Sequence, residues 1–405
     1  MRKKSPLSAF LSLLLPSILL VSSFVVQAQA DSTWSIQTVD ENGDGIGLSM
    51  ALDSKDNPHL CYVDYVNGYY SNPTYLTYAS WNGSDWRIQN VTYTSHVGFI
   101  VLALDSNDNP HIAYNYLRGK GLLYASWTGE NWSIQTIDPE GSVGSLALDS
   151  ADNPHIIYGA NGDLKYAVLK DPNWSIQIVD TEEGLSTPSL ALDSNNHPHV
   201  IYGYSAGNEN TTVKYATWDG SGWNFQTVIS NANVALGNIA IDLRGYPHFT
   251  YYTNGLLMYA SWNGASWNTQ VVDSITEKQS PGFLSFDSNN NPYISYIKGV
   301  KYGDEFLMYA EWTGTRWGIQ TVASSHIISL GSMVLDSSGN PCIGYYGNYH
   351  GVHYIASVMY AKRNTFLSLN QILLIALFVS LLLAVSIAVI VKKRMVKKNE
   401  KHTVN

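Results

Sequence analysis

The chain has 405 residues, of which 45% are hydrophobic, 12% are aromatic and only 14% are charged. This composition excludes an intrinsically disordered protein, and its 28 tyrosines, 12 tryptophans and 32 glycines favour an all-β fold. The formal net charge is -9, but nine of the 23 lysines and arginines lie at the two ends. The central part therefore holds 14 basic and 31 acidic residues, a net charge of -17, and nucleic acid is not expected as a partner.

The first thirty residues have the three parts of a secretory signal peptide. Residues 2–4 are basic, an apolar run extends from Leu7 to Val26, and residues 28–30 read A-Q-A, a small-residue cleavage site. We therefore expect residues 1–30 to be a signal peptide. An uncleaved N-terminal anchor is the alternative.

Seven copies of a two-part repeat occupy residues 31–361. The first motif reads A-L-D-S-x-x-N-P-H and is followed by I-x-Y, and the second reads L-x-Y-A-S-W-x-G-x-x-W-x-x-Q. The Asp of the first motif recurs every 44 to 52 residues, at Asp53, Asp105, Asp149, Asp193, Asp242, Asp287 and Asp336. All twelve tryptophans fall at two positions of the second motif, so the aromatic excess belongs to the repeat.

Each repeat contains four short alternating runs separated by turn signals, which predicts four β-strands. In the third copy these runs are Ser145–Asp149, His155–Tyr158, Leu164–Val168 and Trp174–Val179. The first turn, D-S-x-[DNG]-N-P, places Asp, Asn or Gly where a positive φ is wanted, and the second, W-[NTD]-G-x-x-W, uses Gly. Both turns are predicted to be hairpins, so each repeat should form one four-stranded blade.

Seven such blades predict an all-β, seven-bladed β-propeller. In most copies an alanine lies two residues before the repeat Asp, at a position where sheets would crowd together near the axis. The repeat region begins with a last-type strand, Trp34 to Val39, and its seventh copy stops after a third strand at Ala361. We expect Trp34 to Val39 to complete the seventh blade and close the ring, which removes its open edge.

The C-terminal part has the pattern of a membrane anchor. Residues 362–371 form a short linker, and residues 372–391 contain no charge over a length that spans about 30 Å as a helix. Residues 392–405 form a basic tail, with six Lys or Arg in its first ten residues. The positive-inside rule therefore predicts a single-pass protein of the cell membrane with the propeller outside and the C-terminus in the cytoplasm.

The motifs resemble a known class of repeat. Leu104 to Ile112 (L-D-S-N-D-N-P-H-I) and Leu123 to Gly129 (L-Y-A-S-W-T-G) are similar to repeats of exported bacterial and archaeal surface proteins, which are related to sialidase-like, Asp-box-type β-propellers. The resemblance covers Trp34 to Ala361 and implies the propeller fold. The three-arginine site of sialidases is not expected, because the arginines of the repeat region fall in different turns: Arg87, Arg118, Arg244, Arg316 and Arg363.

Two patterns in the first turn contain side chains that bind metals in other proteins. A histidine follows the turn proline in five copies, at His59, His111, His155, His199 and His248. Seven-fold geometry would spread these rings apart, so we expect each to pack between blades and to hydrogen-bond a turn Asp or a neighbouring carbonyl. The carboxylate pairs of the same turn, such as Asp53 with Asp56, lack the alternate spacing of a calcium loop. No metal, no cofactor and no catalytic residue is therefore predicted.

The loops between second and third strands are the candidate ligand site. They vary in length, are rich in Tyr, Asn and Gly, and by propeller geometry share one face with the connections between blades, which we call the top face. Tyrosine faces stack on sugars and also serve protein paratopes. The predicted ligand-binding residues are Tyr65, Tyr69, Tyr70, Tyr116, Asn161, Tyr204, Tyr252, Tyr302 and Tyr349.

These observations favour a membrane-anchored extracellular binding module with a glycan or a protein as ligand. A surface glycan-processing enzyme (hydrolase or lyase) with a top-face site and a structural envelope component are the alternatives. The turn sequons at Asn82, Asn131 and Asn173 are the predicted N-glycosylation acceptors. The two cysteines, Cys61 and Cys342, are expected to be free and buried, although the sequence leaves open whether they meet.

Overall fold

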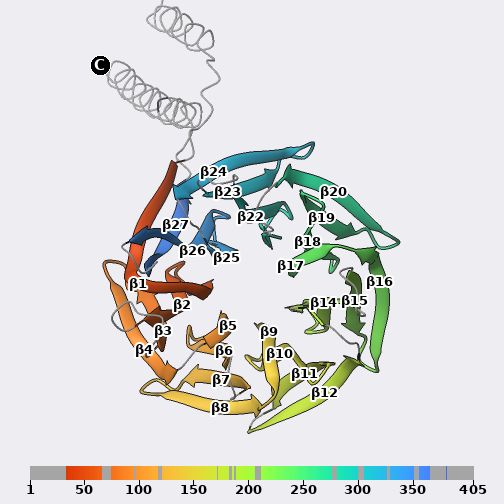
Figure 1. Ribbon diagram of the computed structural model, residues 1–405, viewed down its shortest axis with the longest axis horizontal. Helices are drawn as coiled ribbons and strands as arrows, with labels where there is room; N and C mark the ends of the chain where they lie inside the picture. The colour runs from red at the N-terminus through yellow and green to blue at the C-terminus, as the bar shows by residue number, and fades with distance from the viewer. Residues whose placement is uncertain are drawn as a thin grey trace, which may run out of the picture. The chain divides into compact units, whose positions relative to one another are not determined.

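The structure is a computed structural model that describes residues 33–65, 74–94, 97–116, 121–170, 172–181, 185–186, 188–205, 211–275, 281–299, 305–325, 329–350, 355–364 and 380. Trp34–Arg363 forms one compact unit. Within the described residues this unit is a seven-bladed β-propeller, and the first strands lie innermost around a common axis (Figure 1). The all-β class, the blade number and the four strands of each blade are confirmed.

The strands follow each other blade by blade. Blades one to four contain the inner part of β1 (Thr33–Leu52), then β2 (Pro58–Tyr65), β3 (Thr74–Trp81), β4 (Trp86–Thr94), β5 (Val97–Leu104), β6 (Pro110–Tyr116), β7 (Leu122–Trp127), β8 (Trp132–Asp138), β9 (Gly141–Leu148), β10 (Pro154–Ala160), β11 (Asp163–Lys170), β12 (Asn173–Thr181), β13 (Ser189–Leu192), β14 (Pro198–Tyr204), β15 (Thr211–Trp218) and β16 (Trp223–Ala232).

Blades five to seven contain β17 (Val234–Ile241), β18 (Pro247–Thr253), β19 (Leu256–Trp262), β20 (Trp267–Ser274), β21 (Phe283–Phe286), β22 (Pro292–Gly299), β23 (Glu305–Trp312), β24 (Trp317–Ser325), β25 (Ser329–Leu335), β26 (Pro341–His350) and β27 (Ile355–Asn364). The outer part of β1 joins β27 as the last strand of blade seven.

Both predicted hairpin turns adopt the backbone conformation that their sequences favour. The fourth residue of the first turn has a positive φ in all seven blades, at Asp56, Asp108, Asp152, Asn196, Gly245, Asn290 and Gly339. In the second turn the glycine has a positive φ, for example 98° at Gly83. Because Asp, Asn and Gly tolerate this region best, the turn sequence fixes where each hairpin reverses.

The ring closes as predicted, through a strand shared by two blades. The strand β1 is continuous and hydrogen-bonds to β27 of blade seven and to β2 of blade one. The sequence indicated two separate strands here, but the segment between them also has strand geometry, with a register irregularity between Gly43 and Leu48. The strand β27 continues to Asn364, beyond the predicted end at Ala361.

The hydrophobic core is divided into seven clusters, each between two neighbouring blades. In every interface the fourth-strand tryptophan of one blade meets the third-strand tyrosine of the preceding blade edge-on, with ring centroids 5.1 to 5.9 Å apart. The conserved spacing of Trp and Tyr in the repeat therefore serves contacts between blades, where edge-to-face rings add to the burial of apolar surface.

Among the described residues, no helix is long and apolar enough to cross a membrane. The predicted span at residues 372–391 lies outside the described residues, apart from Ser380, and so do the predicted signal peptide at residues 1–30 and the basic tail at residues 392–405.

Candidate functional site

A cavity of about 620 Å³ lies on the axis, between the first strands of the seven blades. Its volume is within the range of small-molecule and peptide pockets, about 300 to 1,000 Å³. Each of the seven blades contributes to the wall, with residues such as Ser49 of β1, Val101 of β5 and Leu236 of β17. None of the described residues that line it is charged. The cavity therefore offers packing surface and neutral polar groups to a ligand, and no counter-charge.

Most polar side chains of this wall also join neighbouring blades. Their oxygens accept hydrogen bonds from backbone N–H groups in the first strand of the next blade. One side-chain amide also donates a hydrogen bond to a backbone carbonyl there. The pairs are Ser49 with Leu102 (3.0 Å), Ser189 with Ile239 (3.1 Å), Ser332 with Met50 (2.7 Å), and Asn238 with both the N–H (2.6 Å) and the carbonyl (2.9 Å) of Leu284. Because first strands are sheet edges, these bonds satisfy backbone groups that would otherwise face the axis.

The cavity lies toward the top face. Apart from Ile297 of the second strand β22, its lining residues come from the early part of each first strand or from the residues just before it. The antiparallel register places the ends of the second strands beside that same part, as in Ala160 against Gly141 and Tyr116 against Val97. The ends of the second strands and the loops that follow them, where the predicted ligand-binding residues lie, are therefore on the same face as the cavity.

The predicted ligand-binding residues occupy several different environments. Tyr116 and Tyr252 are buried, each 9% exposed, within cores between blades. Tyr204 is half-buried, and the Lys214 ammonium lies 4.9 Å from its ring centroid. Asn161 is exposed in the two-residue turn between β10 and β11, where its φ is 55°. Of these four side chains, Asn161 alone is fully available to a ligand in this conformation.

The other predicted ligand-binding residues lie partly or wholly outside the described part of the chain. Tyr65 ends β2 and Tyr349 lies in β26, but their side chains are not described. Tyr69, Tyr70 and Tyr302 lie outside the described residues. Their role in binding stays a prediction.

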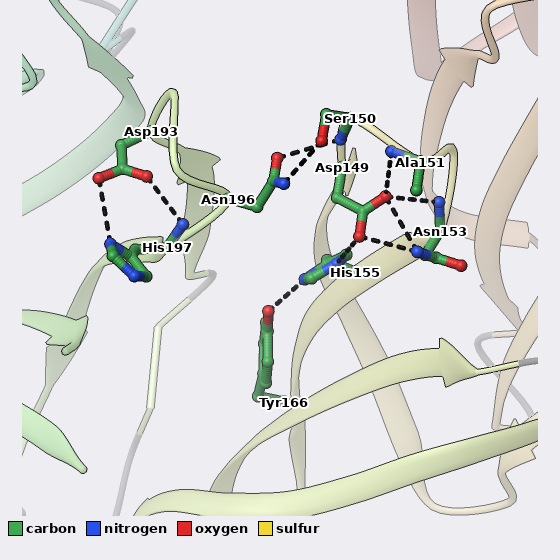
Figure 2. Close-up of polar contacts among 9 residues, drawn as sticks. All are labelled: Asp149, Ser150, Ala151, Asn153, His155, Tyr166, Asp193, Asn196 and His197. Atoms are coloured by element: carbon green, nitrogen blue, oxygen red, sulfur yellow. Dashed lines mark hydrogen bonds and ion pairs between the residues drawn. The ribbon is translucent and has the colours of Figure 1, made fainter. Parts of the chain in front are cut away.

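The histidines of the first turn form an internal network that recurs in five blades, and Figure 2 shows the copy around His155. In blade three the Nδ1 atom of His155 is hydrogen-bonded to the Tyr166 hydroxyl, and its Nε2 atom is 3.3 Å from the Asp149 carboxylate. The same two partners surround the other four histidines. Burial lowers the pKa of each ring, so it is neutral near pH 7, with the Tyr hydroxyl donating to Nδ1.

Each histidine thus hydrogen-bonds a tyrosine of its own blade and lies 3.3 to 3.7 Å from the turn Asp. The predicted hydrogen bond to that Asp is present for His155. One further histidine, His197, contacts the Asp193 that also faces His199. In the described part of the chain, no group of three or more His, Cys, Asp or Glu side chains could hold a metal ion.

The two acidic positions of the first turn have different partners. The Asp149 carboxylate accepts the N–H groups of Ala151 (2.9 Å) and Asn153 (2.8 Å), which fixes its own turn. The positive-φ residue reaches the preceding blade instead, since the Asn196 amide accepts the Ser150 N–H at 3.0 Å and donates to its hydroxyl at 2.8 Å (Figure 2). The repeat Asp therefore stabilises its own turn, and the Asp or Asn with positive φ links that turn to the preceding blade.

A second repeated network was missed by sequence reasoning. An Asp three residues after the repeat Gln accepts a hydrogen bond from a second-strand tyrosine of the next blade, as in Asp180 with Tyr202, Asp273 with Tyr296 (2.7 Å) and Asp138 with Tyr158 (3.2 Å). A lysine completes each of these three groups: Lys214 (3.0 Å), Lys298 (2.8 Å) and Lys165 (3.1 Å), respectively. The recurrence of Q-x-[VI]-D in the sequence was the available signal.

The interface between blades seven and one departs from this pattern. Tyr62 donates to Asp40 at 2.7 Å, but Asp64 stands where blade six has Lys298, two residues after the same tyrosine. One Asp64 oxygen is buried without a hydrogen bond to any described atom. Burial and the nearby Asp40 charge raise the pKa of Asp64 to about 7. This interface therefore carries two acidic groups where the three interfaces described above balance acid with base.

The remaining predicted positions are consistent with surface or packing roles. Asn82, Asn131 and Asn173 are exposed, and their use as glycosylation acceptors stays a prediction. Cys61 and Cys342 are free and buried, as expected, and burial raises the pKa of both thiols.

The arginines expected to lie apart have separate partners in the described residues. Arg244 bonds the Asp242 carboxylate of its own turn in blade five at 2.7 Å, whereas Arg363 bonds Glu311 at 2.5 Å between blades seven and six. Arg118 lies outside the described residues.

Comparison with known proteins identifies the fold alone. No protein-family model and no curated protein matches the sequence. A polysaccharide lyase of family PL25, an ulvan lyase with -[GlcA(1-4)Rha3S]- bound, has a similar structure, with a TM-score of 0.61 and 12% identity over 80% of this chain and 95% of its own.

Two further propellers give comparable values. Virginiamycin B lyase from Staphylococcus aureus has a TM-score of 0.56 and 9% identity over 83% of this chain and 100% of its own. YCF48 bound to D1 peptide has a TM-score of 0.53 and 13% identity over 83% of this chain and 96% of its own.

Proposed function

We propose that this protein is a membrane-anchored extracellular recognition module, which binds a glycan or a protein ligand at the top face. The observation that carries this proposal is the uncharged axial cavity of about 620 Å³, which lies on the same face as the variable, Tyr-rich loops. A closed ring of packed sheets holds such a cavity rigidly. Little of the binding free energy would therefore be spent on ordering the protein when a ligand binds.

The chemistry of the cavity favours binding over catalysis. The described residues of its wall include serine hydroxyls and one asparagine amide, but no carboxylate, imidazole or thiol. A glycan-processing site would need an acid and a base, commonly two carboxylates about 5 to 9 Å apart. The similar propellers hold a polysaccharide fragment in one case and a peptide in another, so both ligand classes are compatible with the fold.

Membrane anchoring is proposed from the sequence. The apolar run at residues 372–391 followed by six basic residues has the length and the charge asymmetry of a single-pass anchor. Protease treatment of intact cells that express the full chain with a C-terminal tag tests this topology. The proposal expects loss of the propeller and survival of a short tagged fragment. A full-length chain in the soluble fraction would contradict it.

Ligand binding is tested with the purified propeller, residues 31–365, on arrays of glycans and of extracellular proteins. The double variant Tyr69→Ala with Tyr70→Ala removes the two aromatic side chains of the longest predicted loop. Phe225→Ala is the matched control, because Phe225 is an exposed aromatic residue (45%) near the start of the outer strand β16, the end of that strand farthest from the top face. We expect binding to fall at least about tenfold in the double variant and to persist in the control.

Two results would contradict this proposal of a recognition site on the top face. Equal binding by all three proteins would move the site elsewhere. No binding to either array, together with regular assemblies of the protein on membranes, would favour the structural envelope component.

A further inference from the structure

Two phenylalanines, Phe99 and Phe283, line the axial cavity, and Phe283 is half-buried against a core between blades. Phe99 is 50% exposed and is part of the cavity wall. Most large apolar residues of the first and second strands are, in contrast, buried in the clusters between blades. An exposed aromatic group inside a concave, uncharged site is a typical feature of a binding pocket.

A β-bulge directs Phe99 toward the axis. The register between β5 and β6 is regular from Leu104 back to Ile100 and then shifts between Ile100 and Val97. The backbone N–H of Phe99 leaves the ladder and donates to the Oδ1 atom of Asn115, a side chain that is only 5% exposed. Bulges often re-aim a side chain next to a functional site, and the buried Asn115 holds this one in place.

The irregularity of blade two spans Gly98 and Phe99, and the corresponding irregularities of three other blades also contain glycine. The register of β9, β17 and β25 shifts at Gly144, at Gly237 with Asn238, and at Gly331, respectively. These glycines are required by close approach of the blades, since a Cβ at Gly331 would lie 2.1 Å from a Leu48 methyl carbon. Blade two therefore differs from these three by presenting a large aromatic group at its bulge.

The polarity of the cavity selects the chemical class of the ligand. An anionic sugar or a charged side chain would lose hydration without meeting a counter-ion, because no described wall residue is charged. A neutral sugar chain carries many hydroxyl groups, and each one left unpaired costs about 1 to 3 kcal/mol. The oxygens of Ser49, Ser189, Ser332 and Asn238 already accept backbone N–H groups of neighbouring blades. Each of these serines keeps one hydroxyl proton to donate, which satisfies few of the hydroxyl groups of a sugar chain. An apolar side chain meets none of these penalties.

We infer that the axial cavity binds an uncharged aromatic or aliphatic side chain presented by a protein ligand, with Phe99 as its main contact. This inference rests on the proposed recognition function and assigns its ligand to the protein class. Contact with Phe99 and the neighbouring Val101 would bury apolar surface, at about 25 cal/mol per Å², against a wall that is already rigid.

The test measures binding of N-phenyl-1-naphthylamine, an uncharged aromatic probe that fluoresces in apolar sites, to residues 31–365. This segment contains the closed ring and all seven cores. Phe99→Ser is expected to weaken probe binding by about tenfold or more. Phe225→Ser is the matched control, because Phe225 is also a half-exposed phenylalanine (45%) but lies on the outer strand β16. Its affinity for the probe should equal that of the unchanged protein.

A second variant in the cavity wall controls for the possibility that Phe99→Ser changes the local fold. Val101→Asp places a charge in the cavity wall and should also abolish probe binding, while circular dichroism checks that each variant keeps its β structure. N-acetyl-phenylalaninamide should displace the probe from the unchanged protein, and maltohexaose should not. Probe binding that survives both cavity variants, or that is lost in Phe225→Ser, would overturn the inference about the site. Displacement by maltohexaose alone would overturn the ligand class.

This test is independent of the test of the proposed function. A ring that binds the probe through Phe99 but recognises no macromolecule on the arrays would retain the cavity site and reject the recognition function. A ring that recognises a glycan through Tyr69 and Tyr70 without binding the probe would retain the recognition function and reject the cavity site.

Discussion

Trp34, at the start of the repeat region, packs edge-on against Tyr309 of blade six, with ring centroids 5.4 Å apart and an interplanar angle of 71°. It occupies the place that a fourth-strand tryptophan has in each of the other six interfaces. The chain therefore completes its last blade with its first strand, and the contact between blades six and seven depends on a residue 275 positions away in the sequence.

Replacement of this tryptophan tests the closure. Trp34→Ala should lower the free energy of unfolding by about 2 kcal/mol or more, because a half-buried indole and its ring contact are lost. Ile36→Ala, on the same strand but 42% exposed, should change it by less than about 0.5 kcal/mol. Urea denaturation of residues 31–365 measures both. Equal stability of the Trp34 variant and the unchanged ring would mean that the closing strand contributes little.

The first-turn link between blades seven and one gives a second test. The Asp56 carboxylate accepts the N–H (2.8 Å) and the hydroxyl (2.5 Å) of Ser337, and Asp56 has a φ of 63°. Asp56→Gly keeps this backbone conformation, as Gly245 does in blade five, but removes the link, and should lower stability by about 1 kcal/mol. Asp56→Ala should lower it by about 1 kcal/mol more, because alanine disfavours a positive φ. Thermal unfolding that ranks alanine above glycine would contradict this account.

Acid should destabilise the ring through its five buried histidines. Burial lowers their pKa in the folded protein, whereas in the unfolded chain it stays near 6.5. As the pH falls through 6.5 the unfolded chain binds more protons than the folded ring, so stability present at higher pH is progressively lost. Unfolding free energies measured between about pH 8 and pH 5 should decrease.

One histidine variant checks the cause of this acid effect. In His155→Tyr the pH-dependent loss of stability should be smaller by about a fifth, because one of the five titrating histidines is removed. The tyrosine should fit, since blade six has Tyr293 at this position and its hydroxyl donates to Asp287 at 3.0 Å. A pH profile identical to that of the unchanged protein would show that His155 does not contribute to it.

Asp64 should act in the opposite direction in the same pH range. Its pKa is raised to about 7 from an ordinary value of 3.8, so its contribution to stability is greatest below the ordinary value and is lost as the pH rises through about 7. At about pH 8 we expect Asp64→Asn to be more stable than the unchanged protein by on the order of 1 kcal/mol. Asp64→Lys, which copies Lys298 of blade six, should be at least as stable as Asp64→Asn. A variant that is less stable at this pH would show that the negative charge of Asp64 is needed in the folded ring.

The local repeat pattern was sufficient for the architecture. The positions of Asp, Gly and Trp predicted the hairpins, the seven blades and the closing strand, because each blade is built from strands that follow one another along the chain. The role of the histidines was also predicted in part, since the Asp that each one contacts lies six residues before it. Their bond to the third-strand tyrosine was not predicted, because it depends on how the strands pair.

The candidate site was predicted less completely. Sequence reasoning selected the tyrosines of the top-face loops, yet Tyr116 and Tyr252 are buried between blades, while Phe99 was not considered. The direction of Phe99 depends on a bulge and on a bond to Asn115, which lies 16 residues later on another strand. Similarly, Asp64 looks like any other acidic residue until Asp40 of the closing strand is placed beside it.

The sequence by itself therefore determined the all-β class, the number of blades and the way the ring closes, because turn chemistry and strand alternation are encoded by neighbouring residues. The tertiary structure decided which polar side chains join blades, which aromatic side chain enters the axial cavity and which carboxylate lacks a balancing cation. Those features arise where blades about 45 residues apart in the sequence pack together, and the register and twist of that packing are properties of the assembled ring.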